Sequence, residues 1–445
     1  MDYLDQVARF AAETRADAIP EEALAKTRLI LADSIGAVLG GMAEPEMRAL
    51  SGRFAAGTAR VLGTGRRATP LHAAFLMGTA GTVLEMDEGS QFARGHPGMH
   101  TIPAALAVAT PETDGGALQA AIAIGYEVGA RVGIASDLRL SMHPHGTWGT
   151  ICAAVAVARL AGADAAAMRT AIGMAATLGL ATSRRTMLEG GTVRNAFTGF
   201  ANHTGVMVGE MLGAGFTAER DGVAHVYGHV VSERFDPAAM TEALGTRWEV
   251  SRNYFKLHAC CRFNHAALDA LALLPETPPE AIETIDVESY SLAAELDDPA
   301  PTNTLGAKFS LPFAIATALV TGTTGVESFT AERVADPAIR ALAAQVTVRE
   351  DPAMTAQLPH RRPARIRLHL RDGRTLEAAT ETNRGDWADP YAPEEIRAKN
   401  VSLATRCWAP AEADAVWEAI MALGRGPTAA LWEALDRAEA TVQSS

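Results

Sequence analysis

The sequence has few aromatic residues, few cysteines and no long apolar run. Aromatic residues make up only 6% of its 445 residues, whereas alanine and glycine recur throughout. This composition suits tightly packed helices rather than a β-sandwich. The four cysteines lack the spacing of a disulfide framework or of a metal knuckle, and two of them, Cys260 and Cys261, are adjacent. We therefore expect a cytoplasmic protein with reduced thiols.

Signals for export, for membrane insertion and for binding to polyanions are also missing. Residues 1–7 lack the basic and apolar regions of a signal peptide. No run reaches the ~18 uninterrupted apolar residues of a membrane span. The formal net charge of −13 has the wrong sign for a nucleic-acid or anionic-membrane surface. The sequence therefore predicts neither a nucleic-acid partner nor a membrane partner.

What the sequence does contain, over its first 250 residues, is helical patterning. Residues 20–36 open with a proline and two acids, which is typical of a helix start. Residues 147–160 and 164–180 are apolar on nearly every side, which indicates helices in the interior of a bundle.

The patterning changes after about residue 275. Residues 282–290 alternate like a half-buried strand, and residues 345–350 suggest a second one. Two further strand patterns flank Arg371-Asp-Gly, a hairpin signal. Helical patterns at 309–319 and 331–344 lie between the strands, and helices return at 411–423 and 429–440.

Chain length and these patterns together predict the domain organisation. A chain of 445 residues exceeds the size at which one hydrophobic core keeps growing, so about two domains are expected. We predict a mainly α protein with a large helical-bundle domain over residues 1–268 and a smaller α+β domain over residues 269–395. Residues 396–445 are expected to form helices that pack back on the first domain.

One polar loop, residues 87–100, interrupts two apolar helical patterns. It holds an acid, a guanidinium and two imidazoles (Asp87, Arg94, His96 and His100). Charged groups are costly to bury unless they are paired, so a polar loop between core helices predicts an active site. A structural interpretation stays open, in which Asp87 caps a helix and Arg94 forms a surface salt bridge.

Six segments together resemble the MmgE/PrpD family, which includes 2-methylcitrate dehydratase, cis-aconitate decarboxylase and iminodisuccinate epimerase. They occur in the family's order and span nearly the whole chain: residues 33–41 (DSIGAVLGG), 87–100, 125–128 (GYEV), 143–147 (HPHGT), 256–265 (KLHACCRFNH) and 308–314 (KFSLPFA). The resemblance implies a large helical domain that holds both termini, covered by a smaller α+β lid. It also implies a homodimer that needs no organic cofactor and no metal.

The resemblance assigns the catalytic roles. It implies His96 and His143 as acid/base residues and Asp87 as a polariser of a neighbouring group. Lys256 is expected to clamp a substrate carboxylate rather than to form a Schiff base, because an acidic substrate would keep the ammonium protonated.

Substrate contacts are implied for six further residues: Arg94, Gln91, Arg194, His265, Cys261 and Phe313. Four of them depart from the decarboxylase pattern. Arg194 replaces a lysine and keeps the positive charge, while Cys261 replaces a histidine. Phe313 replaces a tyrosine, which removes a hydroxyl, and Gln91 corresponds roughly to a threonine. These changes argue against cis-aconitate as the substrate.

Histidines are numerous enough to raise the question of a metal. The helical spacing His-x-x-x-His is represented by His96 and His100, which Pro97-Gly98 separates. That interruption does not give a regular ligand face on a helix, so we expect no metal site.

The leading interpretation is a cofactor-free lyase that removes water or carbon dioxide from a small di- or tricarboxylic acid. The runner-up is an epimerase or isomerase of an imino- or hydroxy-dicarboxylic acid, with His96 and His143 as bases on opposite faces of one carbon. A non-catalytic relative of these enzymes is the third possibility, left open by the substitutions above.

Overall fold

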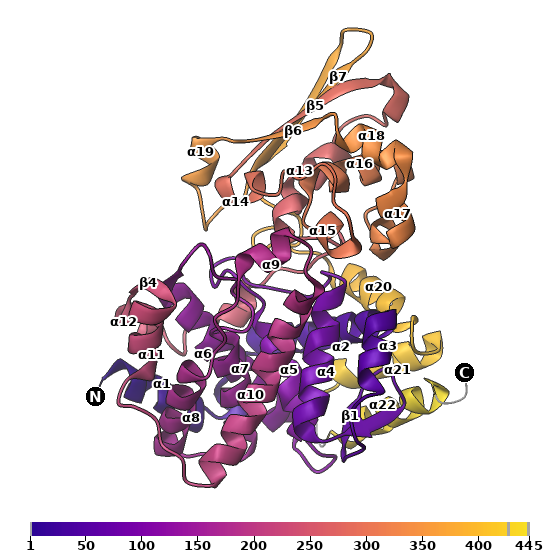
Figure 1. Ribbon diagram of the computed structural model, residues 1–445. Coiled ribbons are helices and arrows are strands. Elements are labelled where there is room, and N and C mark those ends of the chain that lie inside the picture. The colour runs from indigo at the N-terminus through magenta and orange to yellow at the C-terminus, as the bar shows by residue number, and fades with distance from the viewer. Residues whose placement is uncertain (1, 425–427, 443–445) are drawn as a thin grey trace.

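The computed structural model describes residues 2–424 and 428–442, and it has a helical body below a smaller body that contains a sheet (Figure 1). Both chain ends lie in the helical body (Figure 1). The predicted class, mainly α with a smaller α+β part, is confirmed.

The helical body contains the first twelve α-helices, one short hairpin, and one short pair of antiparallel strands that lie far apart in the sequence. The helices are α1 Tyr3–Glu13, α2 Glu21–Met42, α3 Pro45–Ser51, α4 Pro70–Val83, α5 Pro97–Val108, α6 Gly115–Ala135, α7 Gly149–Leu160, α8 Ala165–Thr177, α9 Arg184–Leu188, α10 Ala196–Gly213, α11 Gly222–His225 and α12 Pro237–Thr241. The strand pairs are β1 Ala59–Val61 with β2 Arg66–Ala68, and β3 Ser136–Leu138 with β4 Ser232–Phe235.

The centre of this body is packed with small side chains. Every residue of α7 from 149 to 158 is buried, as the all-round apolar pattern predicts. Close approach of α6 and α7 depends on glycine, because a Cβ at Gly129 would lie 2.0 Å from Sγ of Cys152. Among the described residues, no helix combines the length and the apolarity that a membrane crossing requires.

The lid is the smaller body and contains one mixed sheet. Its elements are α13 Arg262–Ala272, β5 Ile282–Ser289, α14 Ser291–Ala294, α15 Thr304–Lys308, α16 Leu311–Thr321, α17 Ala331–Ala335, α18 Pro337–Ala343, β6 Val346–Glu350, α19 Pro352–Thr355, β7 Ala364–Leu370 and β8 Thr375–Thr380. The strand order is β6-β5-β7-β8, with β5 and β6 parallel and the other neighbours antiparallel.

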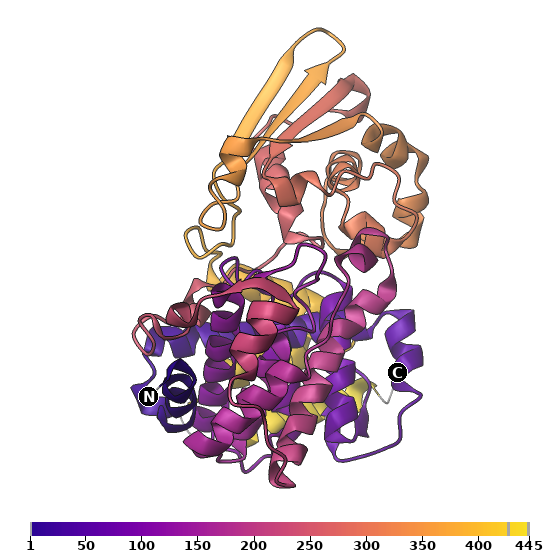
Figure 2. The same ribbon diagram turned by 60° about the vertical axis from the view of Figure 1, so that its left-hand side comes forward.

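One face of the sheet carries the lid's core. Residues alternate between buried and half-buried along β7, which is typical of a strand with one covered face. Figure 2 shows the lid helices gathered on one side of the strands. The single helix predicted at 331–344 is two helices, because Pro337 cannot continue α17 and instead starts α18.

The chain ends with three helices that return to the helical body, α20 Pro393–Ala404, α21 Pro410–Met421 and α22 Ala429–Val442 (Figure 1). Helix α20 packs on α2, where Nζ of Lys399 lies 2.6 Å from Oδ1 of the buried Asp33. The same ammonium donates to the carbonyl of Met86, at 2.5 Å. The far end of the chain therefore fixes the segment that enters the loop at 87. At the other junction, the boundary expected at 268/269 falls inside α13, which packs on β7 and β8.

A buried ion cluster at Arg131 holds α6 to the segment that follows α12. Nε of Arg131 lies 2.6 Å from Oε1 of Glu127, and its Nη atoms donate to four backbone carbonyls. Oε2 of Glu127 accepts the backbone N–H of Glu249 at 2.6 Å. All three side chains are completely buried, and the protein itself supplies their partners.

Candidate active site

The site is built on the loop between α4 and α5. Two non-glycine residues in this loop have positive φ, Glu85 at 55° and Arg94 at 57°. This conformation is unfavourable for L-residues, so the surrounding structure must hold them in it. Gly89 contributes by exchanging backbone hydrogen bonds with Tyr254, on the chain that leads to the lid. The polar side chains of residues 85–96 are therefore fixed in place.

Asp87 and His96 form a buried acid–imidazole pair. Oδ2 of Asp87 lies 2.8 Å from Nδ1 of His96, as an ion pair. Burial opposes ionisation of the carboxyl, but the charges at His96 and Lys256 outweigh it and hold the pKa of Asp87 below its usual range. An ionised Asp87 favours the imidazole tautomer that carries its proton on Nδ1, so Nε2 is the nitrogen that can exchange a proton with a ligand. No described residue forms a hydrogen bond with that Nε2 atom.

Two cations, Arg194 and Lys256, neutralise the charges of Glu85 and Asp87. Nη1 of Arg194 lies 2.5 Å from Oε1 of Glu85, and Nζ of Lys256 lies 3.1 Å from Oε2 of the same carboxylate. Lys256 also lies 3.7 Å from Oδ1 of Asp87. Burial opposes a charged ammonium, but these two carboxylates outweigh it and raise the pKa of Lys256. A protonated Lys256 is no nucleophile, and its charge helps to keep both acids ionised.

His143 faces hydrogen-bond donors with both ring nitrogens. The backbone N–H of His145 donates to Nδ1 at 3.1 Å, and Nε of Arg194 points at Nε2 from 3.4 Å. Burial and the neighbouring Arg194 hold the pKa of His143 well below its usual value. The His143 ring is therefore neutral and has no free lone pair with which to accept a proton.

The neighbouring imidazoles are neutral as well. Nδ1 of His100 bonds the carbonyl of His96 at 2.8 Å while its Nε2 accepts a backbone N–H, and burial lowers its pKa to about 4. The pKa of His145 is well below its usual value, because the residue is buried and lies near Arg194. Its Nδ1 lies 3.0 Å from Oγ1 of Thr198. Of these four histidines, His96 is the one that pairs with a carboxylate while its Nε2 has no partner among the described residues.

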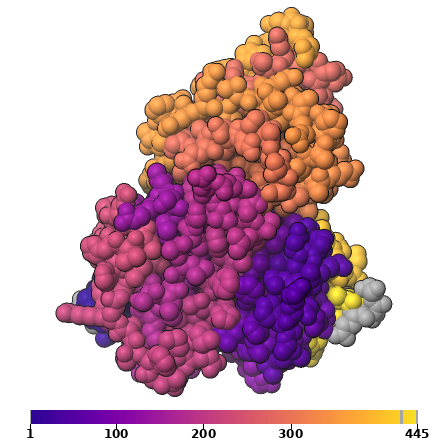
Figure 3. All heavy atoms as spheres, in the orientation of Figure 1, coloured from indigo at the N-terminus to yellow at the C-terminus, as the bar shows by residue number. Residues whose placement is uncertain are grey.

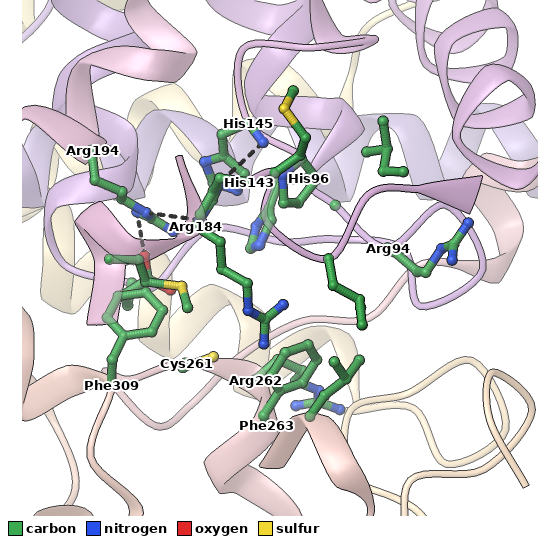
Figure 4. A pocket seen from close by; sticks show the side chains of 18 of the residues that line it. Arg94, His96, His143, His145, Arg184, Arg194, Cys261, Arg262, Phe263 and Phe309 are labelled. Atoms are coloured by element: carbon green, nitrogen blue, oxygen red, sulfur yellow. Dashed lines mark hydrogen bonds and ion pairs between the residues drawn. The ribbon is translucent and has the colours of Figure 1, made fainter. Parts of the chain in front are cut away.

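A cavity of about 140 Å³ opens between the two bodies and suits a small molecule. In Figure 4 the histidines and Arg194 lie on the side of the helical body, and Cys261, Arg262 and Phe263 lie on the opposite side. Figure 3 shows the two bodies in contact with each other. Lid residues form one wall of the cavity, so the lid contributes directly to the site.

The cavity brings together half of the ten residues predicted for the site. The residues that line it are Arg94, His96, His143, Arg194 and Cys261, and those outside its lining are Asp87, Lys256, Gln91, His265 and Phe313. Asp87 and Lys256 act through His96 and Glu85, so they are positioning residues.

The other three residues outside the lining have structural contacts. Nε2 of Gln91 donates to the carbonyls of Pro359 and His360 in the lid, at 3.0 and 3.2 Å. His265 accepts from Arg262 at 2.9 Å through Nδ1, and Phe313 is buried in the lid core.

Arg94 and Cys261 line the cavity, but neither is placed to take part in a reaction. Arg94 donates to the carbonyl of Ser136 and lies 3.4 Å from Asp137, with a side chain that is 41% exposed. This is the surface salt bridge of the structural interpretation. Burial raises the pKa of the Cys261 thiol to about 11, so it is protonated and unreactive near neutral pH. Asp87 does not match the structural interpretation, because the N-cap of α5 is His96.

Five charged residues of the cavity were missed by the sequence analysis. They are Glu85, Arg139, Arg184, Arg262 and Arg362. Glu85 lies two residues before Asp87, and Arg262 lies within the segment that resembles the family, so both were within reach. The His360-Arg-Arg-Pro run before β7 was a visible basic cluster in an acidic chain. Nothing in the sequence placed that cluster next to the loop at 87.

Asp87, His96 and His145 could in principle hold a metal ion, since one ligand atom from each lies within 4.8 Å of the others. A metal would have to replace the proton between Asp87 and His96 and would lie close to the charge of Lys256. Electrostatic repulsion opposes that arrangement. The predicted absence of a metal and of a cofactor stays a prediction.

Known families match nearly the whole chain. The MmgE/PrpD N-terminal domain matches residues 5–237, and the MmgE/PrpD C-terminal domain matches residues 258–424. The chain belongs to the MmgE/PrpD family. The resemblance that rested on six short segments is confirmed, and the two matches follow the helical body and the lid.

Curated members of the family cover most of the chain at low identity. A cis-aconitate decarboxylase-like protein, oryM, of Aspergillus oryzae is 24% identical over 439 residues, which span 90% of both proteins. The cis-aconitate decarboxylase of Aspergillus terreus is 23% identical over 439 residues, with 90% of this chain and 88% of the relative covered. These matches support an enzyme of the dehydratase and decarboxylase type and leave its substrate open.

Proposed function

We propose that this MmgE/PrpD protein is a lyase that removes water or carbon dioxide from a small di- or tricarboxylic acid without a cofactor. The observation that carries the proposal is the buried Asp87–His96 pair beside an arginine-lined cavity. A base next to cationic groups suits removal of a proton α to a carboxylate, because the cations stabilise the charge that develops.

In a dehydration, Nε2 of His96 takes the α-proton and the C–H electron pair forms the new C=C bond. The C–O bond breaks, and the departing hydroxide takes the proton from the same nitrogen and leaves as water. In a decarboxylation, the C–C bond to the carboxylate breaks first. The electron pair that remains on carbon is then protonated by His96 in its imidazolium form. Asp87 stabilises the imidazolium in both cases.

The predicted pair of bases is not supported by the geometry. An epimerase needs a second base that can accept a proton on the opposite face of the carbon. His143 was the predicted partner, but both of its nitrogens face donors and its ring stays neutral. His145 lines the same cavity, but no carboxylate of the described residues pairs with its ring, whereas Asp87 pairs with His96. One imidazole paired with an acid is enough for a lyase, which supports the lyase over the epimerase.

Proton NMR in deuterium oxide with EDTA present tests the proposal. The protein is mixed with 2-methylcitrate, citrate, cis-aconitate, iminodisuccinate and malate. A new alkene signal, or loss of a carboxylate carbon, supports a lyase and identifies its substrate. Deuterium that enters the α position without loss of substrate contradicts the lyase and supports the epimerase. No turnover of any acid would favour the non-catalytic relative.

Assembly and location stay predictions. The homodimer expected from the family is tested by light scattering of the purified chain. A reducing compartment agrees with the four cysteines, all of which are free thiols. Fractionation of the source cells tests the cytoplasmic location.

A further inference from the structure

Six arginines line the cavity, and five of them have a carboxylate from the protein itself. The pairs are Arg94 with Asp137 at 3.4 Å, Arg139 with Glu233 at 3.8 Å, Arg184 with Glu295 at 2.7 Å, Arg194 with Glu85 at 2.5 Å and Arg262 with Asp386 at 2.5 Å. A ligand carboxylate that approaches these five must compete with an internal partner.

Arg362 is the exception. It is 4% exposed, and no carboxylate of the described residues lies within 4.0 Å of its guanidinium. Its Nε and Nη1 atoms are buried without a hydrogen-bond partner, and Nη2 reaches the carbonyl of Gln91 at 3.4 Å. The rings of Tyr254 and Phe263 lie 5.8 and 5.5 Å from the guanidinium carbon. Aromatic faces stabilise a cation, but they leave its N–H donors unused.

Burying a charged group without a counter-charge costs several kcal/mol, so a fold does not keep such a group without a reason. Arg362 lies at the wall of the cavity, where Nη1 has no partner and Nη2 has only the 3.4 Å contact with the carbonyl of Gln91. The Nη1–Nη2 edge of a planar guanidinium matches the two oxygens of a carboxylate.

We propose that Arg362 binds a substrate carboxylate remote from the reacting carbon, and thereby selects acids with a second carboxylate at the lid end of the cavity. The proposal rests on the proposed function, because it places the acid between His96 on the helical body and Arg362 on the lid. It gives the lid a direct contact with the substrate.

Gln91 is the positioning residue for this contact. Its side chain holds the lid segment at Pro359 and His360, and its own carbonyl accepts from Arg362. Gln91 is part of the loop that carries Asp87 and His96, so one residue ties the base and the carboxylate-binding group together. The role in substrate contact that the resemblance implied for Gln91 becomes an indirect one.

The test compares R362Q and R362K with R361Q as a matched control. Arg361 is the neighbouring arginine, but its side chain is 57% exposed and bound to Glu381. The probes are tricarballylate, a saturated tricarboxylate with no hydroxyl to lose, and butyrate, which has one carboxylate. Binding is measured by calorimetry on the full chain, and melting temperature reports on folding.

We expect wild type and R361Q to bind tricarballylate equally, and R362Q to bind it roughly 10- to 100-fold more weakly, the loss typical of a charged hydrogen bond. R362K should restore part of the affinity, and butyrate should bind all four proteins equally weakly. The melting temperature of R362Q should equal or exceed that of wild type, because the substitution removes an unpaired buried charge.

Equal binding of tricarballylate by R362Q and wild type would overturn the proposal, and so would the absence of any binding by wild type. A fall in the melting temperature of R362Q by several degrees would also overturn it, since Arg362 would then be structural. Failure of the proposed function looks different. In that case no acid is turned over in the NMR test, while the difference in binding between wild type and R362Q persists.

With an acid that is turned over, R362Q should raise KM with little change in kcat. Q91A should raise KM less, and Q91E should behave like Q91A, because a carboxylate cannot donate to the lid carbonyls and is repelled by their lone pairs. A lowered kcat with unchanged KM in R362Q would contradict a role in binding.

Discussion

Two buried ion clusters in the helical body use the same residue types in opposite ways. Around Arg131, Glu127 and four backbone carbonyls consume the guanidinium donors, and Glu127 is itself hydrogen-bonded through both oxygens. Around His96, Nε2 has no partner among the described residues, and in the same cavity Arg362 has two nitrogens without one. The two clusters therefore differ in how far the protein satisfies its own buried polar groups.

The contrast has a physical reason. A saturated cluster fixes one geometry and offers nothing to a ligand, because a ligand would have to break existing bonds. An unsatisfied cluster raises the free energy of the empty protein, and a ligand of the right charge recovers that energy on binding. The predictions below test whether the two clusters differ in this way.

The largest effect is expected at the base. H96N and D87N should each lower kcat by roughly 10³-fold or more, because one removes the proton acceptor and the other removes the group that sets its tautomer. Their melting temperatures should stay close to that of wild type. H225N is the control, since His225 forms the same kind of pair with Glu219 on the surface, with a side chain that is 60% exposed. Unfolding of both site variants would make the pair structural.

At the Arg131 cluster we expect a loss of stability rather than a loss of kcat. R131M should destabilise the fold by about 3–5 kcal/mol, because it leaves Glu127 buried without its cation. Thermal or urea unfolding measures this loss. R185M provides the control, since Arg185 and Glu189 have the same i,i+4 spacing as Glu127 and Arg131 but are exposed. Its effect should stay within about 0.5 kcal/mol. Similar losses of unfolding free energy in R131M and R185M would show that the buried Arg131 cluster contributes no more to stability than an exposed ion pair.

Glu88 should make the stability of the fold depend on pH. It accepts the N–H of Gly98 at the start of α5, and burial raises its pKa to about 8. In the unfolded chain the same carboxyl titrates near its ordinary value of 4.5. Between these two values the folded state holds the extra proton, so stability falls as pH rises from about 4.5 to about 8.

E88Q carries no titrating group and should remove that fall. Its melting temperature relative to wild type should therefore rise by roughly 2–5 °C between about pH 5 and about pH 8.5. E46Q, on an exposed residue, should show no such trend. A constant difference between E88Q and wild type over this range would mean that Glu88 is not the group that titrates.

The smallest effect is expected at Cys261. C261A should change kcat/KM by less than about threefold, because the raised pKa keeps the thiol neutral and it contributes only packing. C407A, on a half-buried thiol outside the cavity, is the control. A loss of more than tenfold in C261A alone would give the thiol a direct role.

Much of the fold was predictable from local signals. Proline and acids at the start of α2, apolar patterning in α7 and the Arg371-Asp-Gly turn before β8 each depend on neighbours in sequence. The break at Pro337 was also a local signal, and the prediction of one helix there was wrong because the proline was overlooked.

The site was predictable only in part. The loop at 87 could be found because it interrupts apolar patterns, and the histidine at 143 because its segment resembles the family. Which imidazole is the base depends on the donors that face each nitrogen, and those come from Arg194 and the backbone at 145. Arg362 lies 271 residues from the carbonyl that it contacts, so no sequence pattern connects the two.

The contact between Lys399 and Asp33 has a consequence for how the protein is made. Asp33 leaves the ribosome with α2, but its counter-charge is synthesised 366 residues later, after the whole lid. Because Lys399 also holds the carbonyl of Met86, the loop that carries the base takes its final shape last. A nascent chain can complete its lid early, as domains fold in units during synthesis. The enzyme should therefore gain activity only near the end of translation, and premature termination should release an inactive chain.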